Sequence, residues 1–354
     1  MPDSTPEIFL DLERMKYRHT GLHHFCLQLC NHLIKNATGE QFCTFLPKEL
    51  GTLFGDRVKY RHVNLMDRLF ISGASRFKVW HMTNQHSKYM PASDRTKMIL
   101  TIHDLNYLYE HKAGQRRRKK YAEKLQRKIN RADSIACISE YTRRDVIENL
   151  GVDGKKISVI YNGCNFYDVD ASHIPTYLPG RPFLFTVGTI LPKKNFHVLP
   201  PLLKMTDAEL IISGTKVSGY ADKILEEAKR FNVADRIKFT GPISDMDKTW
   251  YYANCQAFVF PSLAEGFGLP VLEAMYFKKP VFLSNLTALP EIGGKHAYYF
   301  ENFSVEHMHR VFEDGLNDYF SKKDHQDIQE WALGFSWDHA ALKYLELYRQ
   351  IYKD

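Results

Sequence analysis

The sequence predicts an α/β protein with two doubly wound domains, each built on a parallel sheet that helices cover on both faces. Three observations support this fold class. Continuous apolar runs of strand length alternate with helical patterns, a segment with proline and glycine interrupts the alternation near residue 175, and 354 residues suffice for two domains of ordinary size. Continuous apolar strands are typical of parallel sheets that are buried on both faces.

The second half of the chain shows the alternation most clearly. Its short runs are rich in β-branched and aromatic residues, and helical patterns at 221–231 and 245–253 lie between some of them. The first half repeats this arrangement with fewer recognisable runs. The strands that we expect are residues 8–12, 98–102, 135–138, 183–188, 209–212, 236–240, 257–260 and 280–283.

The segment 168–181 has weak periodicity, and we interpret it as a linker between two similarly built domains. The predicted N-terminal domain therefore comprises residues 1–175, and the C-terminal domain comprises residues 176–336. The last segment, 337–352, is amphipathic and predicts a terminal helix. The residues that this helix offers for burial are Leu342, Leu345, Leu347, Tyr348 and Ile351.

Composition narrows the cellular setting that we expect. No apolar run approaches the roughly 18–20 residues that span a bilayer, and the first seven residues lack the basic and apolar regions of a signal peptide. The six cysteines show no C-x-x-C spacing, so they predict neither a disulfide framework nor a zinc site. We therefore expect a cytoplasmic protein.

The most informative stretch covers residues 260–275. Two carboxylates, Glu265 and Glu273, stand on either side of Gly266-Phe267-Gly268, and Leu269-Pro270 follows the glycines. Proline is favoured in the first turn of a helix, so a helix should begin near Pro270. A glycine turn that leads into a helix N-terminus presents backbone N–H groups to an anion. Two acids around such a turn suit a ligand that carries both phosphate and hydroxyl groups, as a nucleotide-sugar does.

This stretch matches the E-x7-E signature, and it resembles the retaining GT-B glycosyltransferases of family 4, also called group 1. The resemblance implies two facing Rossmann-like domains and a C-terminal crossover helix that assigns residues 337–354 to the N-terminal, acceptor-binding domain. It implies that Glu273 holds the donor ribose and that Glu265 contacts the transferred sugar. The other donor-binding positions that it implies are Gly266, Phe267, Gly268 and Leu269.

Residues 188–195, which follow the first strand of the predicted second domain, resemble the family segment G-T-x-x-P-R-K-N. The resemblance places Lys194 at the donor diphosphate. A fixed cation there would stabilise the charge that grows on the phosphate as the glycosidic bond breaks. Lys193 could supply a second charge or could belong to a solvated turn. Replacing Lys194 or Glu273 by alanine is expected to abolish transfer and to leave the fold intact.

Two positions of the first domain also match the family. Gly21 lies in a loop after the opening strand, where the resemblance implies that the backbone approaches the donor phosphates. His103 lies at the carboxyl end of an expected strand, where the resemblance implies a contact with the transferred sugar. A structural role is the alternative for both residues. We also interpret Ser139 as the N-cap of the next helix.

The formal charge of +7 is concentrated in one segment. Residues 112–131 carry ten basic residues and one acid, and their apolar positions share one helical stripe, which leaves a cationic face. A solvated surface helix is one reading of this face, and attachment to an anionic membrane surface is the other. No aromatic platform accompanies the charge, so nucleic acid is not expected. The residues that would meet the membrane are Arg116, Arg117, Arg118, Lys119 and Lys120.

The sequence leaves several functions open. The favoured one is retaining transfer of a sugar from a nucleoside diphosphate, GDP-mannose first and a UDP-sugar next, to a glycan or lipid-linked acceptor, as in mannosyltransferases of cell-surface polysaccharide and lipopolysaccharide synthesis. No metal or other cofactor is expected, and neither D-x-D tripeptide, 168–170 or 245–247, is assigned to a metal. The alternatives are a GT-B phosphorylase, a nucleotide-sugar epimerase, or a non-catalytic module that binds nucleotide-sugar or anionic lipid.

Overall fold

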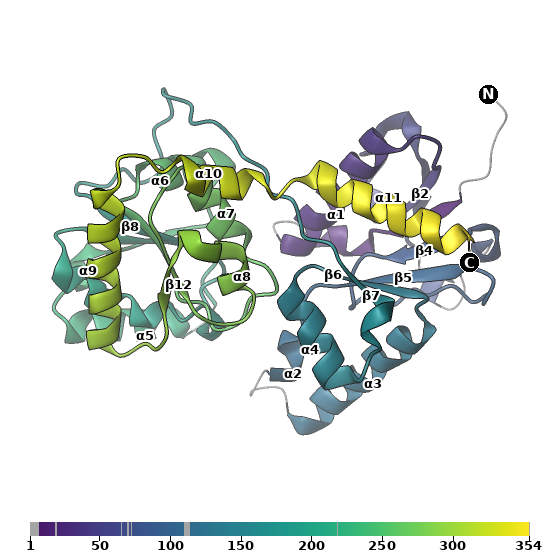
Figure 1. Ribbon diagram of the computed structural model, residues 1–354, viewed down its shortest axis with the longest axis horizontal. Helices are drawn as coiled ribbons and strands as arrows, with labels where there is room; N and C mark the ends of the chain where they lie inside the picture. The colour runs from purple at the N-terminus through teal and green to yellow at the C-terminus, as the bar shows by residue number, and fades with distance from the viewer. Residues whose placement is uncertain are drawn as a thin grey trace. The chain divides into compact units, whose positions relative to one another are not determined.

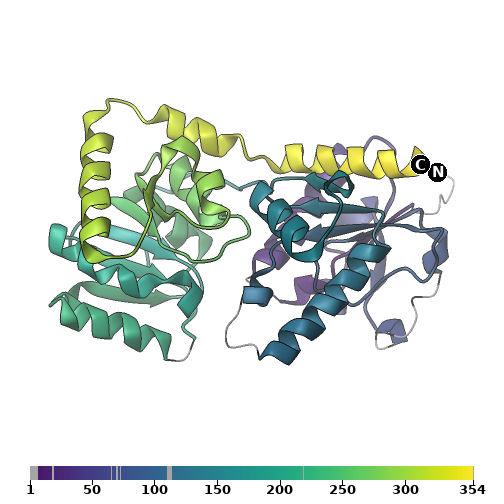
Figure 2. The ribbon, with the colours of Figure 1, turned by 60° about the horizontal axis from the view of Figure 1, so that its bottom comes forward.

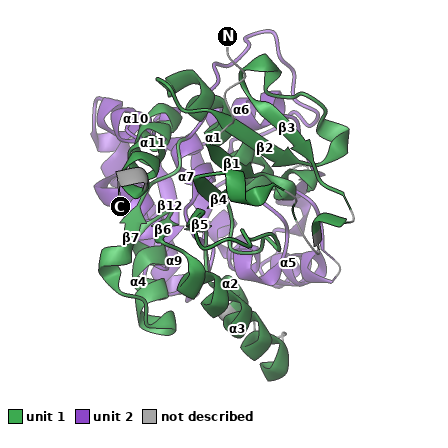
Figure 3. Ribbon diagram, turned by 90° about the vertical axis from the view of Figure 1, so that its right-hand side faces the viewer, with its two compact units in different colours: residues 1–163, 336–354 green, residues 164–335 purple. Residues whose placement is uncertain are grey.

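The computed structural model describes residues 7–17, 20–64, 66–68, 71, 73–109, 114–217 and 219–353. Residues 1–6 and Lys112, which entered the sequence analysis, lie outside these ranges. The chain divides into two compact units, coloured separately in Figure 3. Unit 1 consists of residues 1–163 and 336–354, and unit 2 consists of residues 164–335. Each unit contains its own sheet, which confirms the two Rossmann-like domains.

Unit 1 contains a seven-stranded sheet in the order β3-β2-β1-β4-β5-β6-β7, and each neighbouring pair is parallel. Figure 1 shows α1 and α11 on one side of this sheet and α3 and α4 on the other. The strands are β1 (Ile8–Asp11), β2 (Phe42–Leu46), β3 (Lys59–His62), β4 (Val79–Met82), β5 (Lys97–Ile102), β6 (Ser134–Cys137) and β7 (Ile157–Val159). The helices are α1 (Gly21–Asn36), α2 (Asn106–Tyr109), α3 (Gln115–Arg131), α4 (Glu140–Leu150) and α11 (Trp337–Lys353).

Alternating residues of β1 supply the two cores of unit 1. Ile8 and Leu10 pack with buried residues of α1 and α11, whereas Phe9 packs with buried residues of α3 and α4. Successive side chains of a strand point to opposite faces, so a strand covered on both sides needs an unbroken apolar run. This is the physical reason for the continuous apolar strands in the sequence.

Unit 2 contains a six-stranded parallel sheet in the order β10-β9-β8-β11-β12-β13. Its strands are β8 (Phe183–Val187), β9 (Glu209–Ser213), β10 (Ile237–Gly241), β11 (Ala257–Phe260), β12 (Val281–Ser284) and β13 (Tyr298–Phe300). Its α-helices are α5 (Tyr220–Arg230), α6 (Asp245–Asn254), α7 (Leu269–Tyr276), α8 (Leu289–Gly293), α9 (Val305–Ser321) and α10 (Gln326–Leu333). All eight predicted strands are present, whereas β2, β3, β4, β7 and β13 were not predicted.

The predicted terminal helix is α11, and it belongs to unit 1 as the crossover prediction required. It packs on α1 and β4, and Figure 2 shows it running along unit 1 as the yellow helix. Tyr348 Oη lies 2.7 Å from His81 Nδ1, and Tyr344 Oη lies 2.9 Å from Thr101 Oγ1. Four of the five residues predicted to be buried are buried, but Leu342 is 51% exposed because it faces away from this contact.

The boundary between the units lies after Gly163, earlier than the predicted boundary after residue 175. The segment 164–175 packs on unit 2 because Asp247 holds it. His173 Nε2 lies 2.7 Å from Asp247 Oδ1, and Thr176 Oγ1 donates to Asp247 Oδ2 at 2.6 Å. The second D-x-D tripeptide therefore anchors a connecting segment, a role that the sequence did not reveal.

The order of the strands reverses once in each sheet. In unit 1 the chain moves outward from β1 through β2 to β3 and then returns to add β4 on the other side of β1. In unit 2 it moves from β8 through β9 to β10 and returns to add β11 beside β8. Ligands of doubly wound folds bind outside the carboxyl ends of the two strands that flank such a switch point. The loops after β1, β4, β8 and β11 are therefore the candidate ligand loops.

None of the helices in the described ranges is both long enough and apolar enough to cross a bilayer. All six cysteines are buried free thiols, as their scattered spacing predicted. Ser139 caps α4, because its side chain accepts a hydrogen bond from the backbone N–H of Thr142 at 3.1 Å. This contact confirms the capping prediction.

Candidate active site

The loop after β11 at the switch point of unit 2 contains the glycine turn. The loop ends at Gly268, and α7 begins at Leu269 with Pro270 in its first turn, as predicted. Gly268 has a φ of +132°, and a Cβ atom at this position would lie 3.1 Å from the Leu289 side chain. Only glycine fits this turn without strain.

Lys194 and Glu265 meet across the switch point. Lys194 closes the 3-10 turn Pro192–Lys194 in the loop after β8, and Glu265 lies in the loop after β11. Lys194 Nζ lies 2.5 Å from Glu265 Oε1, and their side chains are 12% and 15% exposed. The residues that the resemblance assigned to the diphosphate, Lys194, and to the transferred sugar, Glu265, therefore form an ion pair.

The surroundings keep Glu265 ionised. Burial raises the pKa of its carboxyl, but the positive charges of Lys194 and then Lys193 outweigh burial and leave the pKa below its ordinary value. Ser262 Oγ also donates a hydrogen bond to Glu265 Oε1 at 2.6 Å. An ionised carboxylate can only accept hydrogen bonds, so Glu265 is suited to ligand hydroxyl groups.

The path of the Lys194 side chain explains the glycine that follows β8. Gly188 has a φ of +145°, and a Cβ atom there would lie 3.1 Å from Lys194 Cε. The Lys194 ammonium also lies 4.7 Å from the centroid of the Phe260 ring. Gly188 and Phe260 therefore fix the position of the charge that the sequence assigned to a diphosphate.

Lys193 links the two loops through its backbone. Its carbonyl oxygen accepts hydrogen bonds from the Leu263 N–H at 2.8 Å and from Ser262 Oγ at 3.3 Å. Its ammonium contributes charge near Glu265. The residue thus holds the loop after β8 against the loop after β11.

Glu273 lies on α7 and contacts a different set of residues. Lys248 Nζ donates to Glu273 Oε1 at 2.8 Å, and Tyr252 Oη donates to Glu273 Oε2 at 2.8 Å. Burial opposes the charge on Lys248, but Glu273 raises the pKa of this ammonium above its ordinary value. Glu273 also lines a small hollow with Phe166 and Tyr276. Glu273 therefore stabilises the contact between α6 and α7, in addition to any role toward a ligand.

The remaining residues of unit 2 that the sequence predicted to bind the donor differ in their exposure. Phe267 is 5% exposed, and its ring centroid lies 5.9 Å from that of Phe335. Its side chain belongs to the core, so Phe267 can contribute to a ligand site only through its backbone. Gly266 is buried at the turn, and Leu269 is partly exposed at the first position of α7.

Gly21 and His103 both lie in unit 1. Gly21 is the first residue of α1, with Thr20 as N-cap, and a Cβ atom there would meet open space among the described atoms. The fold itself therefore does not require glycine at this position. His103 is 9% exposed, and its Nε2 lies 2.9 Å from the Thr83 carbonyl oxygen. A carbonyl only accepts, so Nε2 carries the proton, and Nδ1 is an acceptor in the neutral ring.

Sequence reasoning missed two residues that position Glu265. Ser262 precedes it by three residues in the same loop, a spacing at which a hydroxyl often bonds a neighbouring group. Thr287 accepts a hydrogen bond from the Glu265 N–H at 3.0 Å through its side-chain oxygen, from 22 positions away in the chain. Only Ser262 offered a local signal in the sequence.

The basic segment forms α3, but not all of its charges face solvent. Lys128 Nζ donates to the Gln85 carbonyl at 2.5 Å, and Arg131 Nη2 donates to the carbonyls of Ser93 and Thr96 at 2.8 Å. The predicted cationic face is therefore wrong for these two residues, because both turn toward the body of unit 1. Of Arg116 to Lys120, all but Arg118 are exposed, and Arg118 is partly exposed.

The first D-x-D tripeptide lies in the connecting segment, where Asp168 Oδ1 accepts a hydrogen bond from Tyr276 Oη at 3.2 Å. In the second, Asp245 Oδ1 lies 3.2 Å from Lys248 Nζ. Across the described ranges, no three His, Cys, Asp or Glu side chains are grouped so that they could hold a metal ion.

Two family models match the chain. Residues 174–332 match the glycosyl transferases group 1 model, and residues 54–166 match the Glycosyltransferase Family 4 model. The chain therefore contains a glycosyl transferases group 1 domain and a Glycosyltransferase Family 4 domain.

Two related proteins of Escherichia coli are named mannosyltransferases. The chain is 33% identical over 275 residues to the serotype-specific mannosyltransferase WbdA of Escherichia coli, which covers 71% of this chain and 33% of WbdA. It is 29% identical over 213 residues to the O-antigen chain mannosyltransferase B of Escherichia coli, which covers 56% of this chain and 55% of that protein. The chain thus spans between a third and about half of the length of these curated relatives.

Solved structures share the fold. The Anabaena protein Alr3699/HepE in complex with UDP and glucose superposes with a TM-score of 0.76 at 16% identity, over 98% of this chain and 100% of that chain. A sucrose-phosphate synthase from Thermosynechococcus elongatus superposes with a TM-score of 0.74 at 17% identity, over 99% and 100%. At this level of identity the likeness establishes the GT-B fold.

Proposed function

We propose that the chain is a retaining glycosyltransferase that moves a sugar from a nucleoside diphosphate to a hydroxyl group of a glycan or lipid-linked acceptor. The observation that carries this proposal is the Lys194–Glu265 ion pair at the switch point of unit 2. It holds a cation and an ionised carboxylate at the place where doubly wound folds bind phosphate-containing ligands.

Each member of the pair has a role in this reaction. Lys194 stabilises the negative charge that grows on the leaving diphosphate, and Glu265 accepts hydrogen bonds from the sugar hydroxyl groups. Glu273 holds the ribose, and the backbone from Gly266 to Leu269 lies along the phosphates. We propose same-face attack without a metal, in which the leaving phosphate takes the proton of the acceptor hydroxyl.

GDP-mannose is the donor that we propose first, because the relatives with 33% and 29% identity are named mannosyltransferases. A UDP-sugar is second, because the superposed Anabaena protein was solved with UDP and glucose. A panel of GDP-, UDP- and ADP-sugars in a thermal-shift assay tests the donor. One donor should raise the midpoint of unfolding in the wild type and much less in Lys194→Ala.

The products then separate the proposed function from its alternatives. NMR of a glycosylated acceptor should show the same anomeric configuration as the donor, and added EDTA should leave the rate unchanged. Conversion of the donor without an acceptor would instead indicate an epimerase, and a demand for inorganic phosphate would indicate a phosphorylase. Binding of the donor without turnover or hydrolysis would indicate a non-catalytic binding module.

We also propose that Arg116 to Lys120 attach the protein to an anionic membrane surface. All of these residues except Arg118 are exposed, and each basic residue near such a surface contributes about 1 kcal/mol. Replacing all five by glutamine should release the protein from vesicles that contain phosphatidylserine. Unchanged binding to these vesicles would contradict the attachment.

A further inference from the structure

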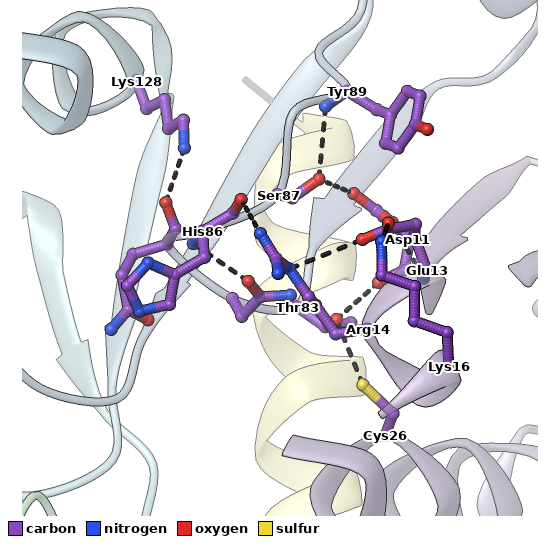
Figure 4. A network of polar contacts seen from close by, with 12 residues as sticks. Asp11, Glu13, Arg14, Lys16, Cys26, Thr83, His86, Ser87, Tyr89 and Lys128 are labelled. Carbon is purple, nitrogen blue, oxygen red and sulfur yellow. Dashed lines mark hydrogen bonds and ion pairs between the residues drawn. The ribbon is translucent and has the colours of Figure 1, made fainter. Parts of the chain in front are cut away.

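The switch point of unit 1 holds a cluster of charged residues to which the proposed function assigns no role. It is the counterpart of the place that holds Lys194 and Glu265 in unit 2, since both lie outside the carboxyl ends of the two strands at which the order reverses. In unit 1 these strands are β1 and β4, and the loops that follow them are residues 12–17 and 83–89. Figure 4 shows the side chains that meet there.

The loop after β4 is held by groups from two other elements. Arg14 Nη2, from the loop after β1, donates to the His86 carbonyl at 2.5 Å, and Lys128 Nζ, from α3, donates to the Gln85 carbonyl at 2.5 Å. Two cations thus bind the carbonyl oxygens of consecutive residues. Each has further N–H groups beyond these contacts, because an ammonium has three donors and a guanidinium has five.

The acidic residues of the cluster, Glu13 and Asp11, do not neutralise the positive charge of its basic residues. Glu13 pairs with Lys16, and its other oxygen lies 3.4 Å from Arg14 Nε, where neither atom has a hydrogen bond within the described part of the chain. Asp11 is fully buried and bonds Ser87, and burial raises the pKa of its carboxyl to about 7, so a large share of it is neutral near pH 7. Three cations therefore face one full negative charge and one partial one.

Two more observations show that the cluster is poised for a negative ligand. The pKa of Lys128 is lowered to about 8, first by burial and then by the charge of Arg14, which means that the two cations repel each other across this site. Asn84 is fully buried in the same loop, and its Nδ2 has no hydrogen-bond partner among the described residues. An anion would relieve the repulsion, and the amide offers it a further donor.

We propose that the switch point of unit 1 binds a phosphate group of the acceptor, with Arg14 and Lys128 as its ligands. The identification of the phosphate as part of the acceptor rests on the proposed function, whereas the existence of the phosphate site does not. Phosphate suits the pair because its oxygens can accept from a guanidinium and an ammonium together. A substrate with a lipid-linked phosphate and a soluble sugar phosphate share this chemistry.

The experiment uses the full-length Lys194→Ala variant, so that binding at the donor site of unit 2 does not obscure the result. Titration calorimetry with inorganic pyrophosphate should still detect one site. Adding Lys128→Gln should weaken that site at least tenfold, whereas adding Arg127→Gln, an exposed neighbour on the same helix, should not change it. Arg14→Lys should keep more affinity than Arg14→Gln, because the charge is retained.

Equal affinity in the Lys128→Gln and parent proteins would overturn the site, and so would an equal loss in Arg127→Gln, which would indicate diffuse surface charge. Competition then identifies the source of the phosphate. Displacement of pyrophosphate by polyprenyl phosphate in phosphatidylcholine vesicles assigns a lipid acceptor, and displacement by mannose 1-phosphate assigns a soluble one. If neither displaces it, the acceptor assignment fails. None of these readouts depends on turnover of a nucleotide-sugar, so a failure of the proposed function would be seen separately.

Discussion

Lys194 Nζ lies 2.5 Å from Glu265 Oε1, although 71 positions separate the two residues in the chain. A donor diphosphate would compete with Glu265 for this ammonium. On the proposed function, the strength of the ion pair would set how strongly this site attracts phosphate and how readily Glu265 binds the sugar. This relationship leads to the first two predictions.

Lys194→Ala should lower kcat by about 10²–10³-fold, the usual cost of removing one group that stabilises charge in the transition state. Lys223→Ala, an exposed lysine on α5, is the matched control and should retain full activity. Steady-state kinetics with the preferred donor measure both. A Lys194→Ala enzyme with wild-type kcat would contradict the role of this residue.

Glu265→Gln should separate binding from turnover. The amide keeps the shape of the side chain but removes the charge that holds Lys194, so the nucleoside diphosphate product should bind at least as tightly as to the wild type. Transfer should fall at the same time, because a neutral amide accepts more weakly from sugar hydroxyl groups. Calorimetry with the product and initial-rate assays give the two quantities, and weaker product binding would refute the competition.

Ser262→Ala tests a positioning residue. A hydrogen bond to a charged group contributes roughly 1.5–3 kcal/mol, so losing the 2.6 Å contact with Glu265 should lower kcat about tenfold. KM should change less, because Ser262 acts through Glu265. Ser321→Ala, at an exposed position that ends α9, serves as the control. An unchanged kcat would show that the Lys194 and Thr287 contacts suffice to hold Glu265.

Glu273→Gln should destabilise the fold as well as impair activity. Lys248 would keep only Asp245, whose side chain is 75% exposed, as a carboxylate partner, while 23% of its own side chain is exposed. Breaking a fully buried pair costs about 3–5 kcal/mol, which is the upper limit of the loss expected here. Urea unfolding should show the loss, and the double variant Lys248→Met/Glu273→Gln should recover much of it. If Glu273→Gln proves as stable as the wild type, the earlier expectation of an intact fold holds for this residue.

Asp11→Asn should change how stability depends on pH. The carboxyl has a pKa of about 7 in the folded protein and near 4 when unfolded, so between these values the unfolded chain releases a proton that the folded chain keeps. Wild-type stability therefore falls as pH rises from 4 to 7, by roughly 1.4 kcal/mol per unit of pKa difference. The free energy of unfolding of the variant should not show this decrease, because its amide does not titrate.

Urea unfolding at pH 4.5 and pH 8 measures the effect. The free energy of unfolding of Asp11→Asn minus that of the wild type should be larger at pH 8 than at pH 4.5, which means that the variant gains stability relative to the wild type as pH rises. Any cost from altered hydrogen bonds to Ser87 is largely the same at both pH values and cancels in this comparison. Asp56→Asn, at an exposed position, should give the same difference at both pH values.

Local patterns predicted eight of the thirteen strands in the described ranges and the glycine turn after β11, because both depend on short-range chemistry. The apolar runs that became β8, β9 and β11 are buried on both faces, and the turn at Gly268 and the helix start near Pro270 follow from backbone geometry alone. Strands such as β2 (Phe42–Leu46) were missed, although every residue in it is buried. It lies between an amphipathic helix and a turn-rich segment, where a five-residue run carries little periodic signal.

Long-range contacts could not be predicted in the same way. Thr287 holds the backbone of Glu265 from another loop, and Asp247 binds the connecting segment through His173 and Thr176. Lys128 was grouped with a solvated basic face, yet it turns inward to the Gln85 carbonyl. Each depends on which loops the sheet order brings together, and sequence spacing does not record that order.

The sequence by itself determined the fold class and predicted Glu265, Glu273 and Lys194 as site residues, because hydrophobic alternation and a glycine turn between two acids are local properties of the chain. Only the tertiary structure decided that Lys194 pairs with Glu265, that Glu273 pairs with Lys248, and that Arg14 and Lys128 converge at the other switch point. The physical reason is the crossover order of the strands. It joins the carboxyl ends of β8 with β11 and of β1 with β4, and so brings together charges that lie far apart in the chain.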